Sequence, residues 1–307
     1  MKRVLLTGAT GFIGRACIGP LLTRGFEIHA VGRSGCGDTD AIVFHRADLL
    51  DLNCLPNLVA KVSPTHLLHC AWGVTDGAYW SSRENLDWLA SGALLLEAFS
   101  RSGGHRAVGI GTCAEYRWDG EICIENHSAL EPATLYGACK LALYHAFAGA
   151  RDLQLSTAWA RIFFPYGAYE RRERLIPSVI RALIAGRPVD CTEGRQVRDP
   201  MHADDVGEAL TALLDCDVTG PVNIAVGIGC SVRQIVEEIV NQLGHRELVQ
   251  FGRLQARRGD PNVLIADCRR LREEIGFRPS ISLSEGIART IAYWRRNERA
   301  DGAKSVL

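Results

Sequence analysis

The sequence predicts an α/β protein with a doubly wound parallel sheet and a smaller C-terminal α/β lobe. Short β-branched runs alternate with helical patterns over roughly the first 160 residues, which is typical of such a sheet. A Gly-x-x-Gly-x-x-Gly spacing at Gly8, Gly11 and Gly14 falls between the first predicted strand and the first predicted helix. After Pro165 the alternation breaks down, which indicates a lobe of different construction.

Hydrophobic spacing and breaker residues predict the elements of the sheet in order. The long helix over about 83–101 carries Leu86, Leu89 and Leu96 at helical spacing, and Gly103 follows its end. Strands are expected at 3–7, 27–31, 42–45, 65–70, 107–111 and 155–162, and helices at about 12–24, 83–101 and 133–151.

The remainder of the chain is predicted to combine helices with short extended pieces. Helices are expected at 176–185, 204–214, 232–243 and about 283–295, with an extended piece near 189–192 and a strand at 222–225. No repeat or low-complexity linker divides the chain. We therefore expect the sheet domain over 1–164 with about 201–226, and the lobe over 165–200 and 227–307.

Composition narrows the classes of protein. Lysine plus arginine equals aspartate plus glutamate at 35 each, so no overall basic field favours nucleic acid or an anionic membrane. No apolar run reaches the roughly 18 residues of a membrane span, and the N-terminus enters the glycine motif without a signal-peptide core. The 11 cysteines show no Cys-x-x-Cys spacing, so we expect no metal site. The expectation is a cytoplasmic protein without nucleic-acid or membrane partners.

The glycine motif predicts a dinucleotide-binding turn in a Rossmann sheet. Gly8 allows a sharp turn, Gly11 lets a pyrophosphate approach the backbone amides, and Gly14 lets the helix pack on the sheet. The N-terminus of the helix then stabilises the phosphate charge. We expect cofactor contacts from Gly8, Thr10, Gly11, Phe12, Ile13 and Gly14.

The end of the second predicted strand favours NADP(H) as cofactor. A carboxylate there would bind the adenosine ribose and repel a 2′-phosphate, but the chain has Arg33 and Ser34, a phosphate partner and a hydroxyl donor. NAD(H) stays possible, because Arg33 can equally be a solvated loop charge. Along the same edge we expect Asp48 beside the adenine amino group and further cofactor contacts from Leu49, Cys70, Ala71 and Trp72.

Tyr136 and Lys140 stand four residues apart on a predicted helix, so both project into the same space. A nearby ammonium is expected to lower the pKa of the phenol from about 10 towards working pH. Tyr136 can then deliver or remove a carbinol proton while hydride moves to or from nicotinamide, and Lys140 can hold the ribose hydroxyls. Thr112, at the end of the fifth predicted strand, supplies a hydroxyl that orients the carbonyl.

The glycine motif together with Thr112, Tyr136 and Lys140 resembles the extended short-chain dehydrogenase/reductase superfamily, also called the NAD-dependent epimerase/dehydratase family. Segments 161–167, 195–206 and 258–260 are similar to family elements of the substrate lobe. The resemblance implies a nucleotide-diphosphate sugar as substrate and a homodimer formed through the helices near 86–99 and 133–150. It also implies that Thr112 and Phe164 contact the substrate and that Leu175 and Ile176 flank its base. Arg198 and Arg258 would bind the diphosphate.

Residues that follow Thr112 separate the reactions of this family. Cys113 and Ala114 replace the Asp-Glu pair of 4,6-dehydratases, and Ala114 also replaces the glutamate of the decarboxylases. Cys113 lies one residue short of the cysteine that 3,5-epimerase/reductases use. Segments 111–116 and 191–194 resemble deoxysugar reductases such as CDP-abequose synthase, although Phe164 stands where the family usually has asparagine.

We therefore interpret the chain as an enzyme of deoxysugar biosynthesis. It would use NADPH to reduce the 4-keto group of a nucleotide-diphosphate (6-deoxy) sugar, with Tyr136 as general acid/base. The alternatives are an NAD-dependent nucleotide-sugar 4-epimerase and a non-catalytic NADP(H)-binding sensor or scaffold. The intact pair of Tyr136 and Lys140 argues against the sensor, because such proteins usually lose this pair.

Overall fold

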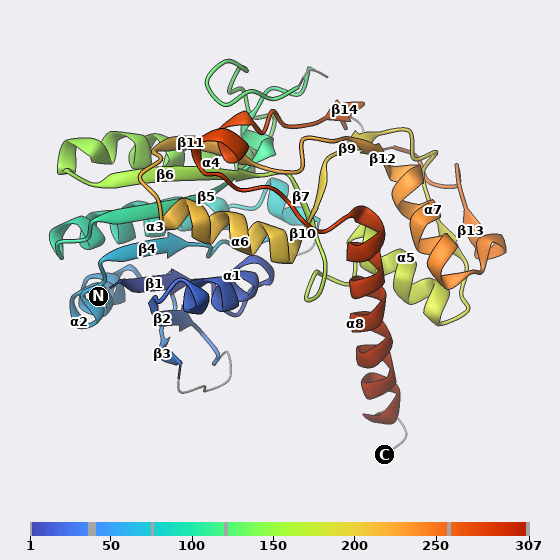
Figure 1. Cartoon of the computed structure of the whole chain (residues 1–307), viewed down its shortest axis with the longest axis horizontal. Helices are drawn as coiled ribbons and strands as arrows, with labels where there is room; N and C mark the ends of the chain where they lie inside the picture. The colour runs from blue at the N-terminus through green and yellow to red at the C-terminus, as the bar shows by residue number, and fades with distance from the viewer. Residues whose placement is uncertain (1, 36–40, 75–76, 120–121, 257–258, 305–307) are drawn as a thin grey trace.

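The centre of the protein is one sheet of seven parallel strands (Figure 1). The computed structural model describes residues 2–35, 41–74, 77–119, 122–256 and 259–304. Within the sheet, Thr7 pairs with Val31 on one side and with His69 on the other. The strands follow the order β11-β6-β5-β4-β1-β2-β3, with bounds β1 Arg3–Thr7, β2 Glu27–Gly32, β3 Ile42–Arg46, β4 His66–His69, β5 Arg106–Thr112, β6 Ser156–Ile162 and β11 Gly220–Ile224.

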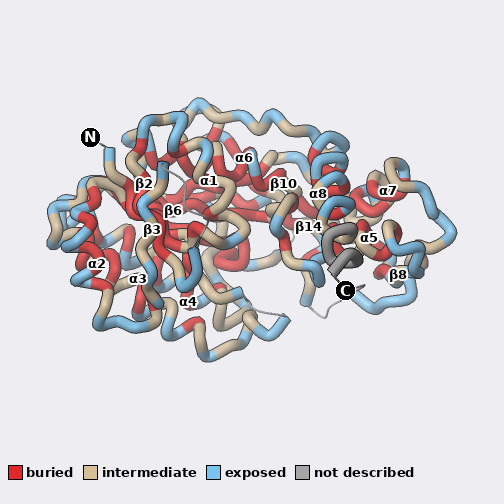
Figure 2. Tube along the Cα trace, turned by 90° about the horizontal axis from the view of Figure 1, so that it is seen from below, coloured by how far each residue is buried: buried red, intermediate tan, exposed pale blue. Residues whose placement is uncertain are grey.

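Helices cover both faces of the sheet because its strands are apolar on both sides. In β1, Val4 and Leu6 pack toward one set of helices and Leu5 toward the other, and none of the three is exposed. Figure 2 shows the buried residues concentrated between these layers. One face carries α1 (Phe12–Thr23) and α6 (Ala203–Leu214), and the other carries α2 (Leu55–Val62), α3 (Glu84–Arg101) and α4 (Leu135–Gly149).

A third hydrophobic cluster lies beyond the carboxyl ends of the strands, to the right in Figure 1. It joins α5 (Leu175–Ile184), α7 (Val232–Leu243) and α8 (Leu283–Lys304), and Ile180 and Ile239 are fully buried in it. Short strands pair around it: β7 Phe164–Tyr166 with β10 Pro200–His202, β8 Val189–Asp190 with β13 Val249–Gln250, and β9 Val197–Arg198 with both β12 Cys230–Ser231 and β14 Val263–Leu264.

The structure confirms the predicted fold class and extends the list of elements. The helix expected at 232–243 has those bounds, whereas the final helix continues to Lys304. The short strands β7, β9, β10, β12, β13 and β14 were not expected, because two or three residues carry no periodicity. Leu264, Cys268 and Leu271 belong to the hydrophobic cluster that includes α1 and α6, and not to the third cluster. The remaining turns are the 3-10 helices η1 Leu52–Cys54, η2 Ala78–Trp80, η3 Cys113–Glu115, η4 Ala150–Leu153 and η5 Arg246–Leu248, and the π-helical η6 Arg270–Glu274.

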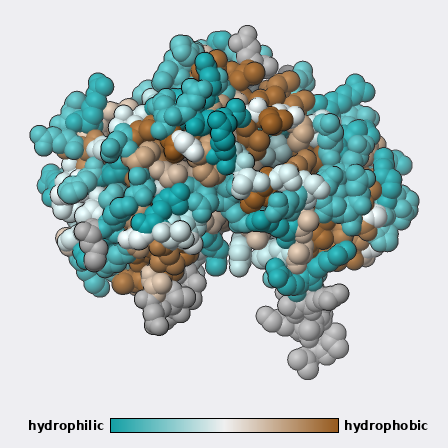
Figure 3. Space-filling view, in the orientation of Figure 1, coloured by the Kyte–Doolittle hydropathy of each residue, from teal (hydrophilic) through white to brown (hydrophobic). Residues whose placement is uncertain are grey.

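Among the described residues, no helix is both long enough and apolar enough to cross a membrane. On the face drawn in Figure 3, hydrophilic side chains surround smaller hydrophobic areas. The His, Cys, Asp and Glu side chains of the described ranges form no group of three that could hold a metal ion.

Close packing of α1 on α6 depends on Gly207. A Cβ atom at Gly207 would overlap the carbonyl oxygen of Ala16 on α1. We expect Gly207→Ala to force the helices apart and to lower the free energy of unfolding by about 1–3 kcal/mol. Chemical denaturation measures this change.

The matched control is Gly149→Ala at the end of α4. Gly149 has helical dihedral angles (φ −75, ψ −19), and nothing lies within 4 Å of its built Cβ. This control should be neutral or stabilise the protein by about 0.5 kcal/mol, since alanine favours helix over glycine. Equal stability of the two variants would contradict the packing argument.

Candidate functional site

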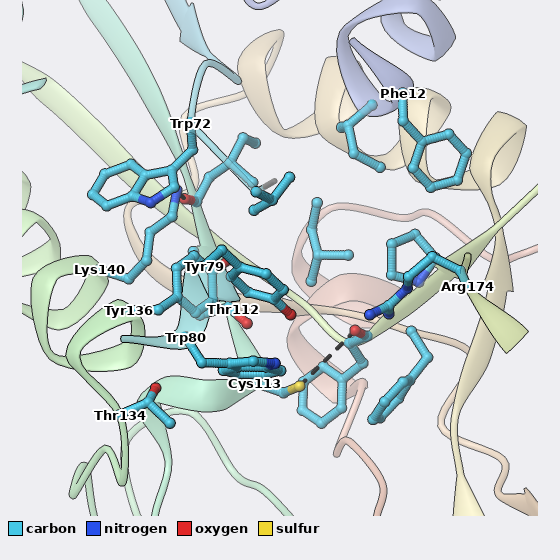
Figure 4. Close-up of a pocket in the computed structure, with 18 of the residues that line it drawn as sticks. Phe12, Trp72, Tyr79, Trp80, Thr112, Cys113, Thr134, Tyr136, Lys140 and Arg174 are labelled. Carbon is cyan, nitrogen blue, oxygen red and sulfur yellow. Dashed lines mark hydrogen bonds between the residues drawn. The ribbon is translucent and has the colours of Figure 1, made fainter. Parts of the chain in front are cut away.

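A cavity of about 610 Å3 opens where the strands of the sheet end (Figure 4). It is lined by Gly8 after β1, Cys70 after β4, Thr112 at the end of β5 and Ile162 at the end of β6. Chain connections leave β1 and β4 toward opposite edges of the sheet, and ligands of open α/β sheets bind at such a switch point. From the other side, the cavity is lined by Phe164, Pro165, Glu170, Arg171, Arg174, Arg198, Gly259, Asp260 and Pro261.

The turn after β1 has room only for backbone. Gly8 has φ +68, and a Cβ there would lie 2.8 Å from the amide nitrogen of Ala71. A Cβ at Gly14 would overlap the carbonyl oxygen of Gly8. Gly11 is the N-cap of α1 and offers no side-chain cap, so the first amides of the helix stay available to an anion. A cradle that any Cβ would fill fits a dinucleotide pyrophosphate.

The predicted cofactor residues divide into two groups. Gly8, Gly11, Phe12, Ile13, Gly14, Cys70, Ala71 and Trp72 line the cavity, whereas Thr10, Arg33, Ser34, Asp48 and Leu49 lie outside its lining along the same sheet edge. Arg33 and Ser34 are exposed directly after β2, and within the described ranges Arg33 forms no ion pair. The carboxylate of Asp48 accepts a hydrogen bond from the Leu50 amide at 3.1 Å, and Leu49 is buried.

Thr112, Tyr136 and Lys140 all line the cavity, as Figure 4 shows. Thr134 caps α4 by accepting a hydrogen bond from the Gly137 amide at 3.1 Å, and this fixes Tyr136 in the first turn. The Lys140 amine donates a hydrogen bond to the carbonyl oxygen of Ile110 at 2.8 Å. It also lies 3.9 Å from the centre of a Trp72 ring. Burial lowers the pKa of Lys140 to about 7.

The expected lowering of the Tyr136 pKa by Lys140 is wrong for this structure. Burial raises the pKa of Tyr136 far above its ordinary value, and a hydrogen bond with Thr112 opposes this rise only in part. The rings of Trp72, Tyr79 and Trp80 pack edge-on around the phenol, with centroids 6.3, 5.1 and 5.7 Å away. The lysine amine meanwhile turns toward Ile110 and Trp72.

Arg198 lies at the cavity, but protein groups already hold its guanidinium. Nη1 donates hydrogen bonds to the carbonyl oxygens of Val197 and Pro261, each at 2.8 Å, and Nη2 pairs with Asp260 at 2.7 Å. Phe164 lies beneath the guanidinium, 5.4 Å from ring centre to carbon. A diphosphate would therefore share Arg198 with Asp260.

Two other predicted substrate contacts, Leu175 and Ile176, are not brought to the cavity. Ile176 is buried in the third cluster at 6% exposure. Leu175, at the first position of α5, is also absent from the cavity lining. Arg258 lies outside the described residues.

Sequence reasoning missed the charged and aromatic residues that loops bring to the cavity. Glu170 is buried at 8% exposure, its Oε2 has no hydrogen-bond partner, and Arg174 approaches its other oxygen at 3.7 Å. Burial raises the pKa of Glu170 to about 8. In the sequence, the charged run from Glu170 to Arg174 suggests a solvated loop. The aromatic pair Tyr79 and Trp80, just before a predicted helix, was the other available signal.

The fold and the cavity together define an α/β oxidoreductase of the dinucleotide-binding kind. Residues 4–229 match the NAD-dependent epimerase/dehydratase family, and the chain belongs to this family. The predicted extended short-chain dehydrogenase/reductase superfamily and the enzyme class are thereby confirmed.

Several known proteins are similar to this chain over most of its length. dTDP-glucose 4,6-dehydratase of Haemophilus influenzae is 25% identical, and the match spans 97% of this chain and 99% of the dehydratase. UDP-glucose 4-epimerase of Corynebacterium glutamicum is 25% identical over 90% of this chain and 91% of its own. The solved structure of MoeE5 with UDP-glucuronic acid and NAD is 29% identical, with a TM-score of 0.85 over 97% of this chain and 100% of MoeE5.

The buried carboxyl of Glu170 makes stability depend on pH. The pKa of Glu170 is raised to about 8 from 4.5. Between pH 4.5 and about pH 8, the native state therefore holds a proton that the unfolded state has released. Stability therefore falls as pH rises through this window. Glu170→Gln removes this loss. Between pH 4 and pH 9, its free energy of unfolding should therefore rise relative to that of wild type by up to about 5 kcal/mol.

Denaturant unfolding at pH 5, 7 and 9 measures this dependence. The matched control is Glu173→Gln in the same segment, because it removes an exposed carboxylate that water already solvates. A stability difference between Glu170→Gln and wild type that stays constant with pH would contradict the assignment.

Proposed function

We propose that the protein uses NADPH to reduce the 4-keto group of a nucleotide-diphosphate sugar, with a 6-deoxy sugar as substrate. The observation that carries this proposal is the set of groups around Tyr136. The thiol of Cys113 is buried beside the Phe163 carbonyl, and burial raises its pKa to about 12. Ala114 has no acid or base, and Glu115 is fully buried in an ion pair with Arg161. Residues 113–115 thus offer Tyr136 no second proton carrier of the kind that removal of water requires.

The residues of the chain support a single proton transfer coupled to hydride transfer. A bound NADPH supplies the hydride. Tyr136 donates its phenolic proton to the carbonyl oxygen, and Thr112 orients that oxygen through its hydroxyl. Lys140, on the same helix as Tyr136, would hold the ribose hydroxyls of the cofactor. The ketone gains one hydride and one proton, which gives the carbinol.

We assign the cofactor to the sheet domain, 1–164 with about 201–226, and the nucleotide sugar to the lobe, 165–200 and 227–307. Arg198 together with the cavity residues Arg171 and Arg174 supplies positive charge suited to a diphosphate. The similarity to MoeE5, which was solved with UDP-glucuronic acid and NAD, supports a nucleotide sugar and a dinucleotide as the two ligands.

The second candidate function is 4-epimerisation with tightly held NAD, which the similarity to UDP-glucose 4-epimerases favours. The protein as purified distinguishes the two. Stoichiometric bound NAD would support the epimerase, and consumption of added NADPH with a 4-keto-6-deoxy nucleotide sugar would support the reductase.

A homodimer through α3 and α4 is part of the proposal, and a monomeric mass in solution would contradict this part.

Arg33 is proposed to select NADP(H) by pairing with the 2′-phosphate. Arg33→Asp should lower the NADPH/NADH ratio of kcat/KM by about 10- to 100-fold, the loss expected for a charge-assisted hydrogen bond. Arg101→Asp is the control, because exposed Arg101 ends α3, which leads into the opposite, amino end of β5. An unchanged ratio in Arg33→Asp would refute the NADP(H) assignment.

Tyr136→Phe tests whether the protein is an enzyme of this mechanism. Phenylalanine keeps the ring against Trp72, Tyr79 and Trp80 and removes only the proton carrier. We expect kcat to fall by about 10²–10⁴-fold while the dissociation constant of NADPH changes little. Tyr144→Phe on the same helix, outside the cavity lining, should keep full activity. A sensor or scaffold would show no turnover in the wild type.

A further inference from the structure

Glu115 is a buried carboxylate that ends the loop after β5 and has four hydrogen bonds. Its Oε1 accepts from the Thr112 amide at 2.8 Å and from Trp159 Nε1 at 3.0 Å. Its Oε2 accepts from Arg161 Nε at 2.6 Å and from Trp159 Nε1 at 3.1 Å. Neither Glu115 nor Arg161 is exposed. Glu115 does not line the cavity, so it acts on the cavity only through the residues that it holds.

The strand β5 is built to admit this carboxylate. A Cβ at Gly111 would lie 2.5 Å from Glu115 Oε1 and would overlap the Trp159 indole nitrogen. A Cβ at Gly109 would overlap the same indole ring. The two glycines therefore let Trp159 of β6 lie across β5 and donate to Glu115. A carboxylate so enclosed needs these donors, because a buried charge without partners is strongly destabilising.

Glu115 reaches the candidate catalytic groups by two routes. Its side chain and the Thr112 side chain form a capping box, in which Glu115 holds the Thr112 amide and Thr112 Oγ1 accepts from the Ala114 amide at 3.2 Å. This fixes the rotamer that presents the Thr112 hydroxyl to Tyr136. Lys140 donates to the Ile110 carbonyl and Glu115 accepts from the Thr112 amide, so backbone groups two residues apart in β5 hold the two charged side chains. The negative charge of Glu115 therefore stabilises the ammonium form of Lys140 against the effect of burial.

We propose that Glu115 is a positioning residue of the reaction: it orients the Thr112 hydroxyl and supplies a buried negative charge that favours the ammonium form of Lys140. The inference rests on the proposed function, because it assigns Glu115 a part in the same proton transfer. In this role Glu115 acts through Thr112 and Lys140, and it is not an acid or base that contacts the substrate.

The charge effect has a definite sign. The groups facing Lys140 from the sheet are Glu115, Cys70 and His69, and Tyr136 lies one turn earlier on its own helix. Burial lowers the pKa of His69 to about 3, so this ring is neutral and cannot replace the charge of Glu115. Removing the carboxylate charge must lower the pKa of Lys140 below about 7.

The experiment compares Glu115→Gln with Glu115→Asp. Glutamine keeps an acceptor for the Thr112 amide but loses the charge, whereas aspartate keeps the charge and draws it away from Thr112. We expect kcat to fall about 10- to 100-fold in both, with KM for the nucleotide sugar within about threefold of wild type. The pH optimum should move to lower pH in Glu115→Gln and stay in place in Glu115→Asp.

Titration of Lys140 by NMR reads the charge effect without turnover. The chain has four lysines, so 13C-lysine labelling gives a simple spectrum in which Lys140→Met identifies the signal. A lower Lys140 pKa in Glu115→Gln than in wild type supports the inference even where no substrate turns over. If the wild-type protein does not turn over NADPH with a 4-keto sugar nucleotide, this result would instead count against the proposed function.

Glu125→Gln is the matched control, because Glu125 is also a buried carboxylate and accepts a backbone hydrogen bond, from Asn223 of β11 at 2.9 Å. It should leave both kcat and the pH optimum unchanged. If Glu115→Gln fails to fold because Arg161 loses its partner, Glu115→Asp keeps the ion pair and still tests the positioning role. The proposal is overturned by wild-type kcat in Glu115→Asp, or by an unshifted Lys140 titration in Glu115→Gln.

Discussion

The backbone turn after β1 rests directly on the backbone that follows β4, and this contact fixes the place of every other group in the cavity. Gly8 has no space for a side chain against Ala71. The Thr7 hydroxyl bridges the same two strands: it lies 2.8 Å from His69 Nδ1 and accepts from the Ala71 amide at 3.2 Å. The chain leaves β1 and β4 toward opposite edges of the sheet. The ends of these two strands therefore form the floor of a crevice, and helices and loops form its sides.

Burial, more than neighbouring charge, decides the protonation of the groups that border this crevice. The Lys140 pKa falls and the Tyr136 and Glu170 pKa values rise, and in each case burial is the largest cause. Sequence spacing shows that a tyrosine and a lysine share a helix face, but it cannot show that aromatic rings enclose them. The expected phenolate is therefore replaced by a phenol that keeps its proton.

The parts of the site that could be predicted are those set by short-range spacing. Gly8 and Gly14 belong to one turn, and Tyr136 and Lys140 belong to one helix, so a local pattern is enough to place them. Arg171 and Trp80 reach the cavity only because distant loops fold over the sheet edge. The aromatic pair of Tyr79 and Trp80 is visible in the sequence, but a local pattern does not show where its loop folds. Ile176 was misplaced for the same reason: the amphipathic pattern of α5 gives a buried face, but not the cluster into which that face turns.

The protonation state of Tyr136 follows from this environment. An enzyme that reduces a ketone needs a phenol that holds its proton until the carbonyl oxygen gains negative charge, and a raised Tyr136 pKa favours that resting state. An enzyme that first oxidises a carbinol needs the opposite, a phenolate stabilised by a nearby ammonium. Lys140 is turned to Ile110 and Trp72, and burial lowers its pKa, so Lys140 gives a phenolate little support. A phenol that keeps its proton is the form from which the proposed reduction would start.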